Sequence, residues 1–246
     1  MSMLQDNPYH ASLSGHGQAV AWAEEWERTV FIRRTYSHLA GAIAAFALIE
    51  AAVFNLVPAE TLARSIGFLV SGWNWLFVLG AFAVVSWIAN SWAVSTTSLS
   101  KQYVGLALYV VAEALIFVPL LFVSSRLGDH VIPAAGVMTG VIFAGLTGMT
   151  FATRADFSWL GRWLCLATLG ALGFIVCAML FGFNLGTLFA AVMIVVASGY
   201  ILYDTSNVIH HYRTDQYVAA SLALFASVAL LFWYVLRIVS AFSSRD

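Results

Sequence analysis

Three carboxylic acids stand inside long apolar stretches of the sequence, namely Glu50, Glu113 and Asp204. An ionised carboxylate is costly in hydrocarbon, so an acid in such a stretch is a candidate for ion or proton chemistry by default. Asp204 is followed by three hydrogen-bonding side chains at residues 205–207. We interpret it either as a proton- or cation-responsive carboxylate or as a helix-end acid in contact with interfacial water.

The other two acids also allow a functional and a structural interpretation. Glu113 lies in the middle of its stretch, six residues before Pro119. It is either a pathway residue for a proton or a cation, or the partner of a tyrosine or serine of another helix. Glu50 is either structural or close to a membrane interface. Arg237 either pairs with an acid or extends its charged end to the interface.

The sequence offers little for catalysis or metal binding. His210 and His211 are adjacent, so on a helix their side chains point about 100° apart and do not meet at one metal ion. They lack the i, i+4 spacing of a helical zinc pair, and no nucleophile-and-base set, phosphate-binding loop or zinc motif is present. We therefore expect no enzyme activity, no cofactor and no metal site.

The composition suits a protein that is dissolved in lipid. Of the 246 residues, 61% are hydrophobic and only 9% are charged, whereas soluble domains carry about 25% charged residues. The net charge of -1 excludes the basic surface that a nucleic-acid partner needs. These values predict an all-α membrane protein with the lipid bilayer as its main partner.

Seven apolar stretches are long enough to cross a hydrocarbon core of about 30 Å, which needs roughly 20 helical residues. Cys165 and Cys177 share one stretch and lie about 18 Å apart along a helix, which is too far for a disulfide. The loops are short, and no stretch indicates a separate soluble domain. The predicted spans are Tyr36–Leu56, Ser71–Val94, Tyr103–Val123, Pro133–Thr153, Trp159–Phe181, Leu185–Tyr203 and Tyr217–Phe242.

The chain divides into a predicted cytoplasmic N-terminal tail, residues 1–34, and a seven-helix transmembrane domain, residues 35–246. Residues 1–18 are polar and lack the apolar region of a signal peptide. In the rest of the tail, Trp22 and Trp26 fall near helical spacing. This pattern indicates either an amphipathic helix at the membrane surface or a helical extension of the first span. The two tryptophans are candidates for binding a partner.

The basic residues favour a cytoplasmic N-terminus and, after seven spans, a C-terminus on the other side. With this orientation seven basic residues are cytoplasmic and four are not, as the positive-inside rule requires. The cytoplasmic set is Arg28, Arg33, Arg34, Lys101, Arg154, Arg162 and Arg213, and the other set is Arg64, Arg126, Arg237 and Arg245.

Several segments resemble the Bax inhibitor-1 family. Ala197–His210 is similar to the family signature, in which small residues are followed by an aromatic residue, an acid and Asn-Ile-Ile. The connection Thr153–Leu160 and the last span, from Tyr217 through Arg237, also fit the family. The resemblance covers about residues 30–246 and points to the bacterial YccA branch. It implies seven helices, the last one central and ringed by the other six, in the inner membrane of a bacterium.

The resemblance implies two activities, of which the first is a pH-sensitive calcium leak. Its sensor in the family is a pair of acids with a basic latch. Asp204 matches the first acid, but Ser227 stands at the position of the second. The latch position falls at Ser98, with Lys101 as the nearest base. Serine supplies no charge to hold a divalent cation, so a lone Asp204 would lose the coupled titration of a carboxylate pair.

The second activity is modulation of a membrane-bound AAA protease of the FtsH type, which the YccA branch contacts through a cytosolic N-terminal tail. Ser227 favours this activity over the leak. The hypotheses are therefore three. The first is a non-enzymatic modulator or partner of a membrane protease or another membrane complex. The second is a proton-regulated calcium or cation leak, with Asp204 as sensor and Glu113 in the pathway. The third is a structural subunit of a larger membrane assembly.

Overall fold

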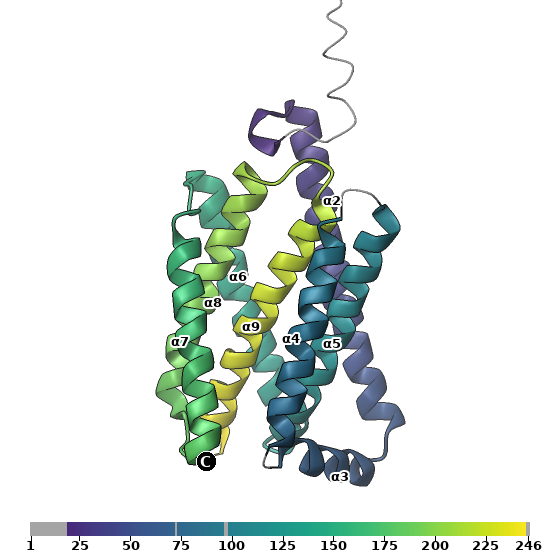
Figure 1. Cartoon of the computed structure of the whole chain (residues 1–246), viewed down its shortest axis with the longest axis vertical. Coiled ribbons are helices and arrows are strands. Elements are labelled where there is room, and N and C mark those ends of the chain that lie inside the picture. Colours follow the sequence, from purple (N-terminus) through teal and green to yellow (C-terminus); the bar gives the residue numbers. More distant parts are fainter. Residues whose placement is uncertain (1–18, 72, 96–97, 245–246) are drawn as a thin grey trace, which may run out of the picture.

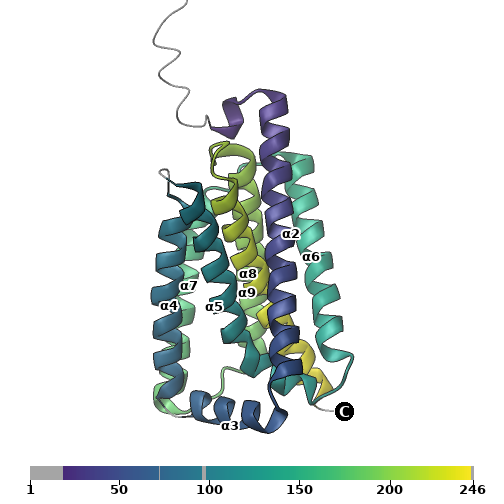
Figure 2. The same cartoon turned by 90° about the vertical axis from the view of Figure 1, so that its right-hand side faces the viewer.

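The computed structural model describes residues 19–71, 73–95 and 98–244. In these residues seven helices are long and apolar enough to cross a membrane, and they form one bundle (Figure 1 and Figure 2). The prediction of seven spans is confirmed. The spanning helices are α2 (Glu25–Leu56), α4 (Asn74–Ala93), α5 (Leu99–Ser125), α6 (Val131–Thr153), α7 (Leu160–Phe181), α8 (Gly186–His210) and α9 (Tyr217–Ser243).

The two ends of the bundle carry different loops. We call the end at which α2 begins the N-face; the α4–α5, α6–α7 and α8–α9 connections also lie there (Figure 1). We call the opposite end, where the chain finishes, the C-face. Since an odd number of helices crosses the bundle, the first and last described residues lie at opposite ends.

Two helices extend well beyond the predicted spans. α2 begins at Glu25 rather than Tyr36, and α8 continues to His210 rather than Tyr203. Hydropathy excluded these turns because they carry charged or polar residues, although such residues do not interrupt a helix. Residues 25–34 are thus one continuous helix with the first span, which is the arrangement that the helical-extension interpretation describes.

The segment in front of α2 folds back over the N-face. It contains the short 3-10 helix η1 (Val20–Trp22), whose first N–H group donates to the carbonyl oxygen of Tyr212 at 2.8 Å. Arg28 donates from Nε to the Val20 carbonyl oxygen at 3.2 Å and from Nη2 to the Ala21 carbonyl oxygen at 3.0 Å. The first bond fastens the segment to the α8–α9 loop, and the two Arg28 bonds fasten it to the start of α2.

An additional helix, α3 (Ala59–Val70), lies across the C-face in both views (Figure 1 and Figure 2). Its 12 residues are too few to cross a membrane, so it is not among the predicted spans. Its own residues Leu62 and Ile66 are buried, whereas Glu60 and Arg64 form an exposed ion pair at 2.7 Å. This amphipathic pattern suits a helix at a membrane interface.

α9 lies inside the bundle. It packs against α2, α4, α5, α6 and α8, whereas α7 packs against α8. Half of the most apolar stretch of α9 is buried, which is the largest buried share among the seven candidate spans. α8, which carries the segment that resembles the family signature, thus lies beside α9, the last span. Both helices can contribute side chains to one interior site.

Helices pack closely at two glycines in the N-face half of the bundle. A Cβ atom at Gly105 of α5 would lie 2.5 Å from the carbonyl oxygen of Ala89 and 2.9 Å from the nitrogen of Ala93. At Gly161 of α7, a Cβ atom would lie 2.8 Å from the ring of Tyr203. Such distances leave no room for a side chain, so these glycines allow direct helix contact.

Candidate functional site

Asp204 and Ser227 face each other in the N-face half of the bundle. Asp204 lies on α8 and Ser227 on α9, and only 7% and 4% of their surfaces are exposed. The Ser227 hydroxyl group donates a hydrogen bond to a carboxylate oxygen of Asp204. The resemblance to the family leads us to expect a second acid at position 227. The neutral hydroxyl group of Ser227 stands there instead and contacts Asp204 directly.

One tyrosine interacts with both Asp204 and Glu113, the acid at mid-membrane depth. Tyr109 of α5 interacts with the carboxyl group of Glu113, one turn further along the same helix, and lies within electrostatic reach of Asp204. Glu113 is buried, and its Oε2 atom has no hydrogen-bond partner within the described part of the chain. The fold therefore brings two of the predicted candidates, Glu113 and Asp204, within interaction range of the same tyrosine.

A pocket of about 390 Å³ with polar lining residues opens at the N-face. Tyr212, one of its lining residues, lies within electrostatic reach of Asp204. Burial raises the pKa of Tyr212, so its hydroxyl group stays protonated and able to donate a hydrogen bond. The lining residues are Ser158, Tyr203, Asn207, His211, Tyr212 and Gln216.

A further carboxylate holds the α6–α7 loop against α8. Oδ1 of Asp156 accepts a hydrogen bond from the backbone N–H of Ser158 at 2.9 Å and lies 3.3 Å from Nε2 of His211. The Ser158 backbone bond, more than the histidine, lowers the pKa of Asp156 to about 2. The backbone N–H of Phe157 donates to the Ser206 hydroxyl group at 2.9 Å. The loop over Asp204 is thus bonded to the helix that carries it.

The adjacent histidines diverge. While His211 reaches Asp156, Nδ1 of His210 lies 3.0 Å from the carbonyl oxygen of Ser206 on its own helix. Among the residues that the structure describes, no three His, Cys, Asp or Glu side chains are grouped to hold a metal ion.

The basic candidates lie apart from Asp204. Ser98 accepts a hydrogen bond from the backbone N–H of Lys101 at 3.4 Å and so caps α5, while Lys101 itself is exposed. Arg237 lies near Tyr234 on α9. The ion pairs within residues 19–71, 73–95 and 98–244 join other residues: Glu60–Arg64, Asp156–His211 and Arg213–Asp215.

Trp22 and Trp26, the candidates for partner binding, lie outside this interior site. They are 84% and 63% exposed, and both belong to the N-face segment of η1 and the start of α2. Trp26 donates from Nε1 to the neighbouring Glu24 at 2.8 Å. Residues 1–18 of the predicted tail lie outside the described residues.

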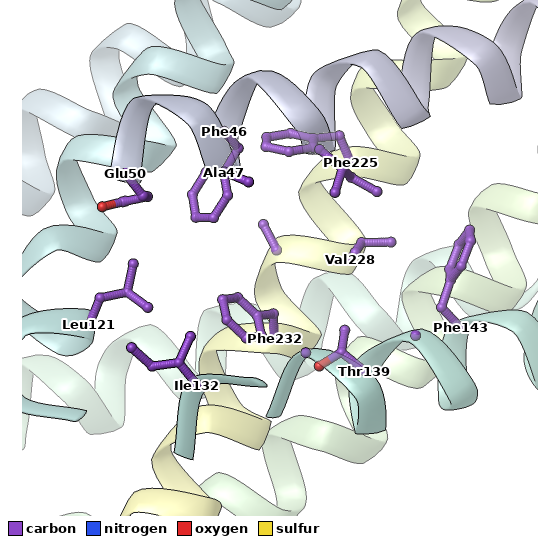
Figure 3. A pocket seen from close by; sticks show the side chains of 14 residues that line it. Phe46, Ala47, Glu50, Leu121, Ile132, Thr139, Phe143, Phe225, Val228 and Phe232 are labelled. Atoms are coloured by element: carbon purple, nitrogen blue, oxygen red, sulfur yellow. The ribbon is translucent and has the colours of Figure 1, made fainter. Parts of the chain in front are cut away.

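Glu50, the remaining buried acid, lies in the other half of the bundle. It stands at one end of a pocket of about 420 Å³ between α2, α6 and α9, close to Leu121 of α5 (Figure 3). Both of its carboxylate oxygens are buried and lack a hydrogen-bond partner within the described part of the chain. Glu50 therefore belongs to a site of its own.

Sequence reasoning missed Tyr109 and the Asp156–His211 pair. Tyr109 and Glu113 are four residues apart and so lie on one face of a helix, a signal that could have identified the tyrosine. Asp156 and His211 are 55 positions apart. Only the packing of α8 beside the α6–α7 loop brings them together.

A family model described as "Inhibitor of apoptosis-promoting Bax1" matches residues 28–244, which include the whole interior site. The chain belongs to the Bax inhibitor-1 family. The match confirms the resemblance that the α8 segment and the last span indicated.

Relatives in this family include bacterial and eukaryotic proteins. The chain is 28% identical to "Bax inhibitor 1" of Schizosaccharomyces pombe over 225 residues, 89% of this chain and 79% of the relative. It is 34% identical to "Modulator of FtsH protease YccA" of Escherichia coli over 126 residues, 51% of this chain and 56% of that protein. It is 27% identical to "Protein lifeguard 4" of the mouse over 123 residues, 47% of this chain and 49% of that protein.

Proposed function

We propose that this Bax inhibitor-1 family member is a non-enzymatic modulator of a membrane-bound AAA protease of the FtsH type. It acts in the inner membrane of a bacterium with its N-face toward the cytoplasm. The observation that carries the proposal is the hydrogen bond from Ser227 to Asp204. It leaves the site with one acid and a neutral partner, not the acid pair that the resemblance links to a calcium leak.

Two further observations support this proposal. The relative in Escherichia coli is named as a modulator of the FtsH protease. In addition, Trp22 and Trp26 expose large aromatic surfaces at the N-face, beside a segment that is bonded to the α8–α9 loop through Val20 and Tyr212. Exposed tryptophans are enriched among residues that anchor protein–protein contacts, so this surface is a suitable place for the protease to engage.

The test reconstitutes the protein with an FtsH-type protease in the same liposomes and measures the degradation rate of a membrane substrate. Wild type should slow degradation and co-purify with the protease. The double variant Trp22→Ala and Trp26→Ala should weaken both effects about tenfold, the usual scale for losing an aromatic anchor. Trp87→Ala on α4, where Trp87 is 73% exposed, is the matched control.

The proposal would be contradicted if wild type left the degradation rate of the substrate unchanged. It would also be contradicted if Trp87→Ala weakened the two effects as much as the double variant does. If the protein instead co-purified from native membranes with a complex that lacks a protease, this result would support the hypothesis that it is a structural subunit of that complex.

The second candidate is a proton-regulated cation leak. It is favoured by the interaction of Tyr109 with both Glu113 and Asp204, since buried polar groups inside a membrane domain mark ion or proton paths. Calcium flux into liposomes separates the two candidates. Flux that depends on pH and disappears in Asp204→Asn would establish the leak. Flux that is absent in wild type and present in Ser227→Asp would show that Ser227 keeps the site closed.

A further inference from the structure

The pocket beside Glu50 has almost wholly apolar walls. α2 and α6 form two sides of it, and α9 passes between them (Figure 3). Of the two polar side chains that line it, Thr139 donates to the carbonyl oxygen of Ala135 at 2.8 Å on its own helix. Only the Glu50 carboxyl group remains without a partner. The aromatic part of the wall consists of Phe46, Phe143, Phe225 and Phe232.

The pocket opens sideways toward the membrane. α2 and α6 each pack against α9, but they are not among the helix pairs in close contact with each other. On α6 the wall is formed by Gly136 and Gly140, and a Cβ atom at either position would meet no atom within 4 Å. On α2 it includes Ile43, which is 38% exposed. A long apolar molecule can thus enter from the bilayer between the two helices.

The depth of Glu50 suits one part of a lipid. Glu50 lies six residues before the end of α2 at Leu56, which is about 9 Å along the helix. The amphipathic helix α3 follows at the C-face and marks the interface there. The hydrocarbon core is about 30 Å of a total of 40–45 Å, so Glu50 lies near the border between the acyl chains and the headgroups.

We propose that this pocket binds one acyl chain of a diacyl phospholipid, with the ester carbonyl oxygen accepting a hydrogen bond from Glu50. A carboxyl group in its acid form offers one O–H donor, and an ionised carboxylate without a partner is costly at this depth. No basic side chain lines the pocket, so the site does not match the anionic head of a free fatty acid. The volume of about 420 Å³ lies within the ordinary range of ligand pockets, about 300–1,000 Å³.

This inference is independent of the proposed function, because neither the protease contact nor the Asp204 site takes part in it. Its test counts the phospholipids that remain bound to the protein in native mass spectrometry after release from nanodiscs of one synthetic phospholipid. Wild type should retain one phospholipid, and Gly140→Phe, which fills the pocket, should lose it.

The matched control is Gly148→Phe on the same helix. A Cβ atom at Gly148 also meets no atom within 4 Å, but Gly148 does not line this pocket. It should retain the phospholipid. Equal retention in Gly140→Phe and Gly148→Phe, or no retention in wild type, would overturn the proposal.

A second measurement tests Glu50 itself. Nanodiscs of a diether phospholipid with the same chains lack the ester carbonyl group. Wild type should retain the diester lipid about fivefold better than the diether lipid, the scale of one hydrogen bond. Glu50→Leu should bind both equally. The assignment would be overturned if wild type retained the diester and the diether lipid equally. It would also be overturned if wild type preferentially retained a free fatty acid or an alkylamine that was added to the nanodiscs.

Discussion

Asp204 in the N-face half and Glu50 in the C-face half are both buried acids on spanning helices, but their surroundings differ. Ser227 donates a hydrogen bond to Asp204, whereas neither oxygen of Glu50 has a partner within the described part of the chain. The glycines differ in the same way, since Gly105 abuts backbone atoms of α4 and Gly140 faces open space. A side chain of the bundle thus satisfies Asp204, while Glu50 lies beside a pocket that leaves room for a molecule of the bilayer.

The largest expected effect concerns the two glycines. Gly105→Ala should lower the free energy of unfolding by about 3 kcal/mol, because the added methyl group would force α4 and α5 apart. Gly140→Ala should raise it by about 0.5–1 kcal/mol, because alanine favours the helix and meets no neighbour. Reversible unfolding in detergent micelles measures both changes. If both variants changed the free energy of unfolding by the same amount, the helices would be packed equally closely around Gly105 and Gly140.

A smaller effect is expected at the two acids. Ser227→Ala leaves a buried carboxylate without its donor and should cost about 2 kcal/mol. Glu50→Leu removes a buried acid that has no partner, so the free energy of unfolding should stay within about 0.5 kcal/mol of wild type or rise. The same unfolding measurement compares the two variants.

Ser221→Ala is the control for this pair of variants. Ser221 is also buried on α9, but its hydroxyl group bonds to the carbonyl oxygen of Val218 on the same helix at 2.8 Å. It should therefore cost clearly less than Ser227→Ala. If Glu50→Leu lowered the free energy of unfolding more than Ser227→Ala does, the contrast between the two acids would be reversed.

The smallest effect belongs to the N-face loop. The pKa of Asp156 is lowered from 3.8 to about 2 in the folded state. Its ionised form therefore stabilises the protein above the unfolded pKa, and this contribution is lost as the pH falls through the folded pKa. Asp156→Ala should cost about 0.5–1 kcal/mol at neutral pH, and the difference from wild type should shrink between about pH 4 and pH 2.

Unfolding at several pH values in this range checks the prediction, with Glu60→Gln on α3 as control. Glu60 forms an exposed ion pair with Arg64, and such pairs contribute little. A difference between wild type and Asp156→Ala that stays constant down to pH ~2 would show that the Asp156 charge does not stabilise the loop over Asp204.

The sequence by itself determined the number of spans, because each stretch carries enough apolar residues to cross the bilayer, whatever its neighbours are. It also singled out Asp204 and the serine at position 227 through the family signature. It did not determine α3, whose 12 residues are too short for that test, or the full length of α2, whose first turns carry charges.

Only the tertiary structure decided what surrounds each acid. Glu50 and Glu113 look alike in the sequence, since each is a single acid among apolar residues, and Asp204 differs only in the polar residues 205–207 that follow it. Their difference depends on which helices pack together: α8 against α9 gives Asp204 its serine, and the gap between α2 and α6 leaves Glu50 beside a pocket. Hydropathy carries no information on such lateral contacts, because every face of a spanning helix is apolar whether it meets lipid or another helix.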